Sequence, residues 1–357
     1  IIAVLSFLAV STAAVTYKDS DPLLLVQTVI RHADRAATHG FATPESPTIL
    51  FRGNEELTDD GIDNAYKQGQ DFKKRYVKTG FIDKRYLPSE VYFRSSAVSR
   101  CLMSAASFAA ALFKTTDNDR NIVPPIFTVD PDTDSLLVPL LTCTDGWDDV
   151  LTKYNLTASN NTMNNAMYGM IANGEWPASC STVNPGLVDA IVSELPNKKI
   201  NLPKDYKKCA KDGGKRFMYS FLDLLGGGGH SYNELRMKRT IGILTNELLN
   251  NMAAAASCST ASCGPKFRVY YTHDLNVLTL SHVFNATDLY QGITPSFSSA
   301  LVFELRQGSN GPYVKVFLKD GQKADFIDSG LCDGDCSFAA VQQAAQQFAI
   351  SEPIICA

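Results

Sequence analysis

The feature that most constrains the fold is a largely apolar segment, residues 23–30, which runs directly into Arg31, His32, Ala33, Asp34 and Arg35. A strand without alternating polar residues is typical of the centre of a parallel sheet, where helices cover both faces. A charged run directly after such a strand lies at its carboxyl end, where open α/β sheets bind ligands. The segment therefore predicts a central strand of an α/β sheet with a polar site at its end.

Other predicted strands and helices alternate along the chain. The predicted strands are residues 23–30, 91–93, 267–271, 300–305 and 313–318. The last two flank a turn rich in Gly, Ser, Asn and Pro and predict an antiparallel hairpin. Helical spacing of apolar residues predicts helices at 59–76, 99–113 and 234–252, and Thr58 followed by two aspartates is a typical helix start.

The middle of the chain has a different character. Residues 117–232 show no convincing alternation of strands and helices and are rich in Asn, Asp, Pro and Gly. We expect a mostly helical insertion there, and one α/β domain built from residues 16–116 and 233–357. The expected fold class is α/β, with a mixed, mainly parallel sheet flanked by helices and a smaller, mostly helical inserted domain.

Several features predict passage through a secretory route. Residues 1–15 are mainly apolar, end in small residues and fall short of the ~20 residues that span a bilayer, so we expect part of a signal peptide. Nine cysteines suit disulfides in an oxidising compartment. Glycosylation acceptors stand at Asn155, Asn160 and Asn285. We expect a secreted protein, or one delivered to a lysosome-like lumen, without a membrane span.

The charge of the chain limits its partners. The formal net charge is −4 and the pI is near 5.8, so the protein lacks the basic field that nucleic acids require. An anionic substrate would have to be held by a local cluster of arginines instead.

Residues suited to phosphoryl chemistry follow three predicted strands. These residues are Arg31, His32 and Arg35 after the first strand, Arg94 after the second, and His273 and Asp274 after the third. Guanidinium groups are permanently charged and bind phosphate oxygens in pairs. A neutral imidazole can attack phosphorus, and a carboxylic acid can protonate an alcohol leaving group. Such a reaction requires no metal and no cofactor.

The first and the last of these sequence segments resemble the signatures of a known family. Residues 31–35 resemble the Arg-His-Gly-x-Arg-x-Pro signature of the histidine acid phosphatases, in the phosphoglycerate-mutase-like superfamily, and residues 271–274 resemble their His-Asp signature. Residues 57–61, 91–105 and 332–336 also fit, so the resemblance covers about residues 22 to 356. The implied roles are nucleophile for His32, phosphate binding for Arg31, Arg35, Arg94 and His273, and leaving-group acid for Asp274. Ala33 and Ala37 depart from the family's Gly and Pro.

The cysteines are assigned in two ways. The resemblance to prostatic and lysosomal acid phosphatases implies the pairs Cys143 with Cys356 and Cys332 with Cys336. For the remaining cysteines we predict Cys180 with Cys209 and Cys258 with Cys263, which leaves Cys101 free on an apolar helix face.

Two functional hypotheses remain. The first is a secreted acid phosphatase that hydrolyses phosphate monoesters through a phosphohistidine, with an acidic optimum because Asp274 must be protonated when it acts. The second is a secreted binding protein with weak or no turnover, for which Ala33 and Ala37 are the only support. Relatives often dimerise through the sheet edge, so a homodimer is left open, and no motif in the insertion indicates the natural substrate.

Overall fold

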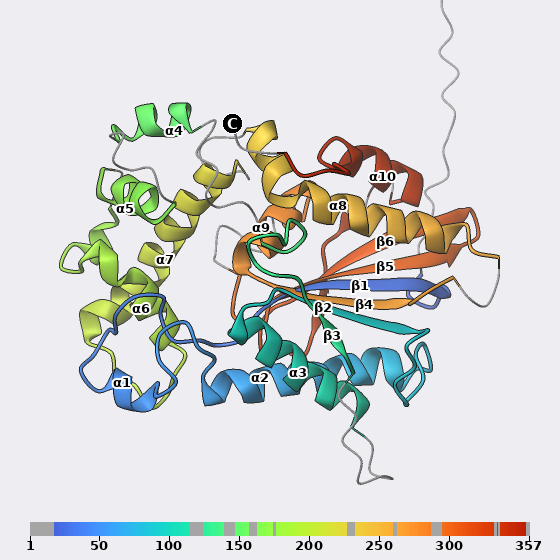
Figure 1. The fold of residues 1–357 in the computed structure, drawn as a ribbon, viewed down its shortest axis with the longest axis horizontal. Helices are drawn as coiled ribbons and strands as arrows, with labels where there is room; N and C mark the ends of the chain where they lie inside the picture. The colour runs from blue at the N-terminus through green and yellow to red at the C-terminus, as the bar shows by residue number, and fades with distance from the viewer. Residues whose placement is uncertain are drawn as a thin grey trace, which may run out of the picture.

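The structure, a computed structural model, describes residues 18–114, 124–138, 147–156, 163–173, 176–226, 233–259, 263–286, 295–331, 334 and 336–354 (Figure 1). The predicted signal peptide, the acceptor Asn160 and the cysteines Cys143, Cys332 and Cys356 lie outside these residues. Within the described part, no helix is both long and apolar enough to cross a bilayer.

One mixed sheet forms the centre of the fold. Its strands are β1 (Leu23–Arg31), β2 (Val91–Ser95), β3 (Ile126–Phe127), β4 (Phe267–Thr272), β5 (Ala300–Gly308), β6 (Gly311–Lys319) and β7 (Phe326–Asp328). Their order is β3-β2-β4-β1-β5-β6-β7. The first four pair in parallel, and β5, β6 and β7 are antiparallel to their neighbours. The predicted mixed sheet and the β5–β6 hairpin are confirmed.

Some helices cover the two faces of this sheet, and others lie to one side of it (Figure 1). The helices of the described residues are α1 (Ser46–Ile49), α2 (Asp59–Phe72), α3 (Ser99–Phe113), α4 (Asp148–Lys153), α5 (Met163–Asn173), α6 (Val188–Glu194), α7 (Lys204–Leu225), α8 (Glu234–Ala256), α9 (Asp274–Val283) and α10 (Phe338–Gln346). Those to one side of the sheet are α1 and α4 to α7. A π-helix at Lys73–Val77 continues α2, and short 3-10 helices occupy Ala178–Cys180 and Pro185–Leu187. In Figure 1, α2 and α3 lie on one face of the sheet and α8 and α10 on the other.

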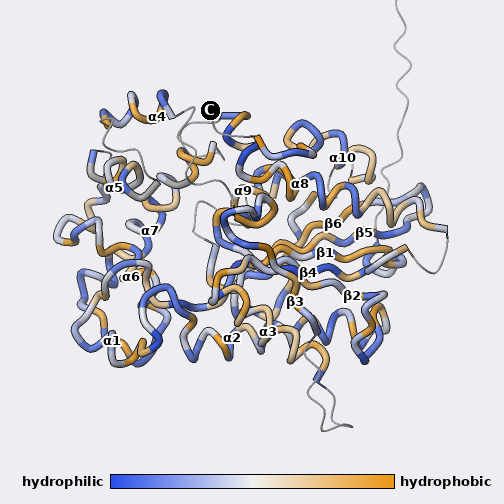
Figure 2. Tube along the Cα trace, viewed as in Figure 1, coloured by the Kyte–Doolittle hydropathy of each residue, from blue (hydrophilic) through white to orange (hydrophobic). Residues whose placement is uncertain are grey.

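The central strand β1 is largely apolar, and both of its faces are covered. Leu25 and Val29 pack in the cluster that includes α8 and α9, while Val26 and Ile30 pack in the cluster that includes α2 and α3. Gln27 is also buried, and its side-chain nitrogen donates to the Leu248 carbonyl of α8 at 2.9 Å. Figure 2 shows the same apolar stretches along the strands.

Two strands were not expected from the sequence. The two-residue strand β3 lies within the segment where we expected no strand, and it pairs with β2 through Phe93 and Arg94. The three-residue strand β7 forms the opposite edge of the sheet beside β6. Both are too short to produce a readable hydrophobic period.

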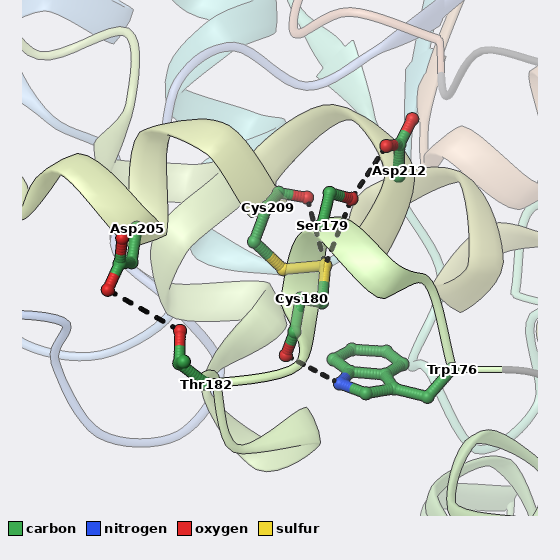
Figure 3. Close-up of a disulfide and its surroundings, with 7 residues drawn as sticks. All are labelled: Trp176, Ser179, Cys180, Thr182, Asp205, Cys209 and Asp212. Carbon is green, nitrogen blue, oxygen red and sulfur yellow. Dashed lines mark hydrogen bonds between the residues drawn. A yellow bond between two sulfur atoms is a disulfide. The ribbon is translucent and has the colours of Figure 1, made fainter.

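A disulfide lies within residues 117–232, the segment predicted to be an insertion and called the insertion below. Cys180 and Cys209 are bonded, with their Cα atoms 4.6 Å apart, and this bond joins the short helix Ala178–Cys180 to α7 (Figure 3). The indole nitrogen of Trp176 donates to the Cys180 carbonyl at 2.9 Å. A side chain at Gly213 would collide with the disulfide, since its Cβ would lie 2.9 Å from the Cys209 sulfur. The position of α7 is therefore fixed where the disulfide meets it.

The structure confirms the other described cysteine predictions. Cys258 and Cys263 are bonded, and Cys101 is free and buried on α3. The pairs that involve Cys143, Cys332 and Cys356 lie outside the described residues. The described glycosylation acceptors, Asn155 and Asn285, are both exposed.

Candidate active site

The carboxyl ends of three adjacent strands meet at the predicted site. In the parallel pairing, Arg31 of β1 lies beside Thr272 of β4, and Ser95 of β2 lies beside Tyr271 of β4. The residues that follow these three strands therefore lie at the same edge of the sheet. The backbone N–H of His32 donates to the Thr272 carbonyl at 2.9 Å, which fixes the start of the loop after β1 against β4.

His32 is held in one tautomer. Its Nδ1 lies 2.9 Å from the Ala33 carbonyl oxygen, and because a carbonyl only accepts, Nδ1 carries the proton. The lone pair is then on Nε2. Burial is the main cause that lowers the pKa of His32 well below 6.5, and the positive charges of Arg100 and Arg31 lower it further. Burial therefore favours the neutral imidazole, the form that a nucleophile must have.

Three buried arginines of the site are each paired with an aspartate. Nη2 of Arg31 lies 2.8 Å from Asp274, Nη2 of Arg35 lies 3.0 Å from Asp189, and Nη2 of Arg94 lies 2.6 Å from Asp134. Arg35 and Asp189 form a two-pronged contact, since Nη1 also donates to Asp189 at 3.3 Å. Buried charges require such partners, because an unpaired charge in a protein interior is strongly unfavourable.

Some guanidinium donors remain unused. The Nε atoms of Arg31, Arg35 and Arg100 are buried and lack a hydrogen-bond partner among the described residues. A buried N–H without a partner is costly, so these atoms mark a place where a ligand would supply acceptors. Phosphate oxygens suit such donors because charged hydrogen bonds are strong and guanidinium geometry matches them.

His273 and Asp274 stand at the start of α9. His273 is its N-cap residue, and its Nε2 lies 3.3 Å from the Ser96 hydroxyl. The His273 and His32 rings are 5.7 Å apart between centres. Burial lowers the pKa of His273 below 6.5, so this imidazole is also neutral. Burial acts to raise the pKa of Asp274, but the charges of Arg31 and Arg35 outweigh it, and the pKa is lowered.

The structure adds Asp134 and Asp189 to the site, neither of which the sequence indicated. Asp189 belongs to α6 in the insertion and is 154 positions from Arg35, so no local pattern joins the two. It also accepts the backbone N–H of Thr38 at 2.6 Å. Asp134 follows the unexpected strand β3.

Arg100 is a further cation beside the two histidines. It lies in the first turn of α3 and pairs with Glu55 at 3.1 Å. Its charge is the strongest of those that lower the pKa of His32 and His273, ahead of the charges of Arg31 and Arg35. Arg100 was not predicted from the sequence as part of the site. Its position six residues after Arg94, at the start of a predicted helix, could have indicated that it lies there.

The two alanines of the signature loop fit without strain. Ala33 is fully buried against Leu57 and Ala65, and its backbone φ is not positive, so no glycine is needed there. Its N–H donates to the Ser104 hydroxyl of α3 at 3.0 Å. Ala37 is also fully buried. The two substitutions therefore give no support to the hypothesis of an inactive binding protein.

Comparisons with known proteins agree with this geometry. The family model described as "Histidine phosphatase superfamily (branch 2)" matches residues 23–210. The chain is 29% identical to lysosomal acid phosphatase of Xenopus laevis, over 86% of this chain and 72% of the relative. It is 26% identical to human prostatic acid phosphatase, over 84% and 78%. The solved apo form of Hafnia alvei phytase matches the fold with a TM-score of 0.60 at 15% identity, covering 94% of this chain and 98% of that one.

The ion pair between Arg35 and Asp189 should contribute measurably to the free energy of unfolding. Asp189→Asn leaves the buried guanidinium without a counter-charge, so we expect the free energy of unfolding to fall by about 3 kcal/mol at pH 7. Burial acts to raise the pKa of Asp189, but Arg35 and Thr38 hold it below 3.8. Since the folded state has the lower pKa, the stabilisation is present above pH 3.8 and is lost as the pH falls through the folded pKa.

Urea unfolding of the parent protein and of Asp189→Asn, from pH 7 to below pH 3.8, checks the prediction. Asp63→Asn, on the exposed side of α2, is a matched control and should leave stability unchanged. A variant as stable as the parent at pH 7 would contradict the assigned role of the pair.

Proposed function

Because the chain belongs to branch 2 of the histidine phosphatase superfamily and is a phosphatase, we propose that it hydrolyses phosphate monoesters at acidic pH through a phosphohistidine on His32. The observation that carries this proposal is the neutral imidazole of His32, whose Nε2 lone pair is free beside three buried guanidinium groups.

In the first step, Nε2 of His32 attacks phosphorus and the bond to the alcohol oxygen breaks. Negative charge spreads over the equatorial phosphate oxygens, and we assign their stabilisation to Arg31, Arg35, Arg94 and His273. The unused Nε donors of Arg31 and Arg35 support this assignment, because phosphate oxygens would satisfy them.

We assign Asp274 as the group that protonates the leaving oxygen. Asp274 first receives this proton from the substrate. In the empty site the carboxyl is ionised, because its pKa is lowered by Arg31 and Arg35. A phosphate monoester loses its second proton near pH 6, so at pH ~5 it arrives as a monoanion. Once its oxygens take up the guanidinium charges, Asp274 is less stabilised as an anion and accepts this proton. It then gives the proton to the alcohol oxygen.

In the second step, water attacks the phosphohistidine. Asp274, now a carboxylate, takes a proton from this water, and the N–P bond breaks, which restores the neutral imidazole of His32. The proton then passes from Asp274 to the departing phosphate, so the carboxyl is ionised again before the next ester binds. This sequence consumes one water per ester. It draws on no metal ion, and we expect EDTA to leave turnover at pH ~5 unchanged; a loss that added divalent cations restore would contradict it.

The secretory route is also part of the proposal. The described acceptors Asn155 and Asn285 are exposed, and two disulfides are formed, as expected of a chain that folds in an oxidising compartment. The relatives include a lysosomal and a prostatic acid phosphatase. We propose that the protein is secreted or delivered to a lysosome-like lumen.

His32→Ala tests the nucleophile. We expect phosphate release from 4-nitrophenyl phosphate at pH ~5 to fall by at least about a thousandfold, because the covalent path is lost. His39→Ala is the matched control, since His39 is exposed and should not affect turnover. Thermal unfolding of both variants should match the parent. Undiminished turnover in a folded His32→Ala protein would contradict the assignment.

Asp274→Asn tests the proton donor. An alkyl phosphate such as 2-glycerophosphate has a poor leaving group and needs the proton, whereas 4-nitrophenolate leaves readily without it. We expect kcat/KM for the alkyl ester to fall at least about a hundredfold more than for the nitrophenyl ester. Equal losses on the two esters would assign Asp274 to binding rather than to proton transfer.

A further inference from the structure

A cavity of about 610 Å³ lies between the insertion and the end of the sheet. One wall is formed by α7 and by Val192 and Leu195 of the α6 region, and the other by the loop before β5 and the loop after β6. Figure 1 shows α6 and α7 to one side of the sheet. Arg31 is the one lining residue to which the proposed reaction gives a role.

The cavity meets the candidate active site at Arg31. This residue lines the cavity, and its Nη2 holds Asp274 at 2.8 Å. The Arg31 guanidinium also lies 4.2 Å from the centre of the Phe297 ring, which lines the same cavity. The centre of the Phe297 ring is in turn 5.9 Å from that of His32. The cavity therefore begins beside the group that would protonate the leaving oxygen.

The lining combines apolar side chains with charges of both signs, since Asp34 and Asp320 line it as well as Arg31 and three lysines. Lys211 and Lys215 are exposed and lie four residues apart on α7, so they project from the same helix face. Leu195 offers an apolar surface that is 46% exposed, and the buried Phe297 also lines the cavity. The third lysine, Lys323, is already paired with Asp320 at 2.7 Å.

The two lysines are carried by a rigid part of the insertion. They lie on either side of Gly213, where an added Cβ would be 2.9 Å from the Cys209 sulfur of the Cys180–Cys209 disulfide. The α6 region is fixed as well, since Asp189 binds Arg35 and Glu194 accepts from the Ser46 hydroxyl at 2.6 Å. A ligand in the cavity would meet preorganised charges, which limits the entropy lost on binding.

We propose that this cavity holds the leaving group of the substrate and that Lys211 and Lys215 select phosphate monoesters whose leaving group carries a second anionic group. The proposal rests on the proposed function, because the leaving group is defined by the ester that His32 cleaves. The apolar wall would pack against the carbon skeleton between the two anionic groups. The second group is a phosphate or a carboxylate, since both bind ammonium groups in the same way.

A matched substrate series tests this proposal. The three probes are phenyl phosphate, 4-carboxyphenyl phosphate and benzene-1,4-diyl bisphosphate, which share one aromatic skeleton. In the Lys211→Gln/Lys215→Gln double variant, we expect kcat/KM to fall about tenfold for the two charged probes, as for the loss of two exposed ion pairs. For phenyl phosphate it should stay within about twofold, because that leaving group has no second charge. The loss should shrink in high salt.

Lys198→Gln/Lys199→Gln is the matched control. Both lysines are exposed on the insertion and lie outside the cavity, so this variant makes the same change in net charge. It should treat the three probes as the parent does. A loss confined to the carboxylate or to the bisphosphate would support the proposal and identify the second group.

Four results would overturn it. An unchanged kcat/KM for both charged probes in the cavity variant, or an equal fall for all three probes, would overturn the inference and leave the phosphatase assignment intact. An equal fall of kcat/KM for the charged probes in both double variants would show that the effect comes from net charge and not from the cavity. A parent protein that hydrolyses none of the probes would contradict the proposed function, and the inference with it.

Discussion

The pairing of buried arginines with aspartates from distant elements is the constraint on which the rest of the structure depends. Three guanidinium groups lie at the ends of β1 and β2, and each is held by an aspartate from a different part of the chain. Breaking one such pair typically costs about 3–5 kcal/mol, which is a large share of a domain's stability. The pairs therefore fix the insertion, the loop after β3 and the start of α9 against the sheet.

The same pairing determines how an anion would be recognised. Because each arginine already has a counter-charge, the site does not act as a bare cluster of positive charge. It offers unpaired Nε donors and two neutral imidazoles, which favour a ligand with several acceptor oxygens in defined positions. In the proposed mechanism the phosphate competes with Asp274 for Arg31. This competition is what allows an aspartate with a lowered pKa to act as an acid.

Much of the sheet was predictable because its residues carry local patterns. The apolar run of β1, the hairpin of β5 and β6 and the capped helix after Thr58 each show a period or a turn signal within a few residues. The three strand ends also follow from the sequence, since charged residues stand directly after apolar segments. The resemblance to a known family supplied their roles, which the spacing alone did not.

Other features had no local signal. Strand β3 has two residues, and only its pairing with β2 makes it a strand. Asp134 and Asp189 reach the site through tertiary packing, so their proximity to Arg94 and Arg35 could not be read from the chain. The tautomer of His32 depends on the position of one carbonyl, that of Ala33. Whether Ala33 strained the loop depended on its φ, which the sequence does not specify.

The most direct test of the account is to trap the phosphorylated enzyme. The protein is mixed with 4-nitrophenyl phosphate at pH ~5, quenched within milliseconds in base, which preserves phosphohistidine, and digested for mass spectrometry. The account predicts a phosphoryl group on Nε2 of His32 in the peptide that contains residues 31–35. Steady turnover with no phosphoryl group on His32 at any quench time, or with one on a different residue, would contradict it.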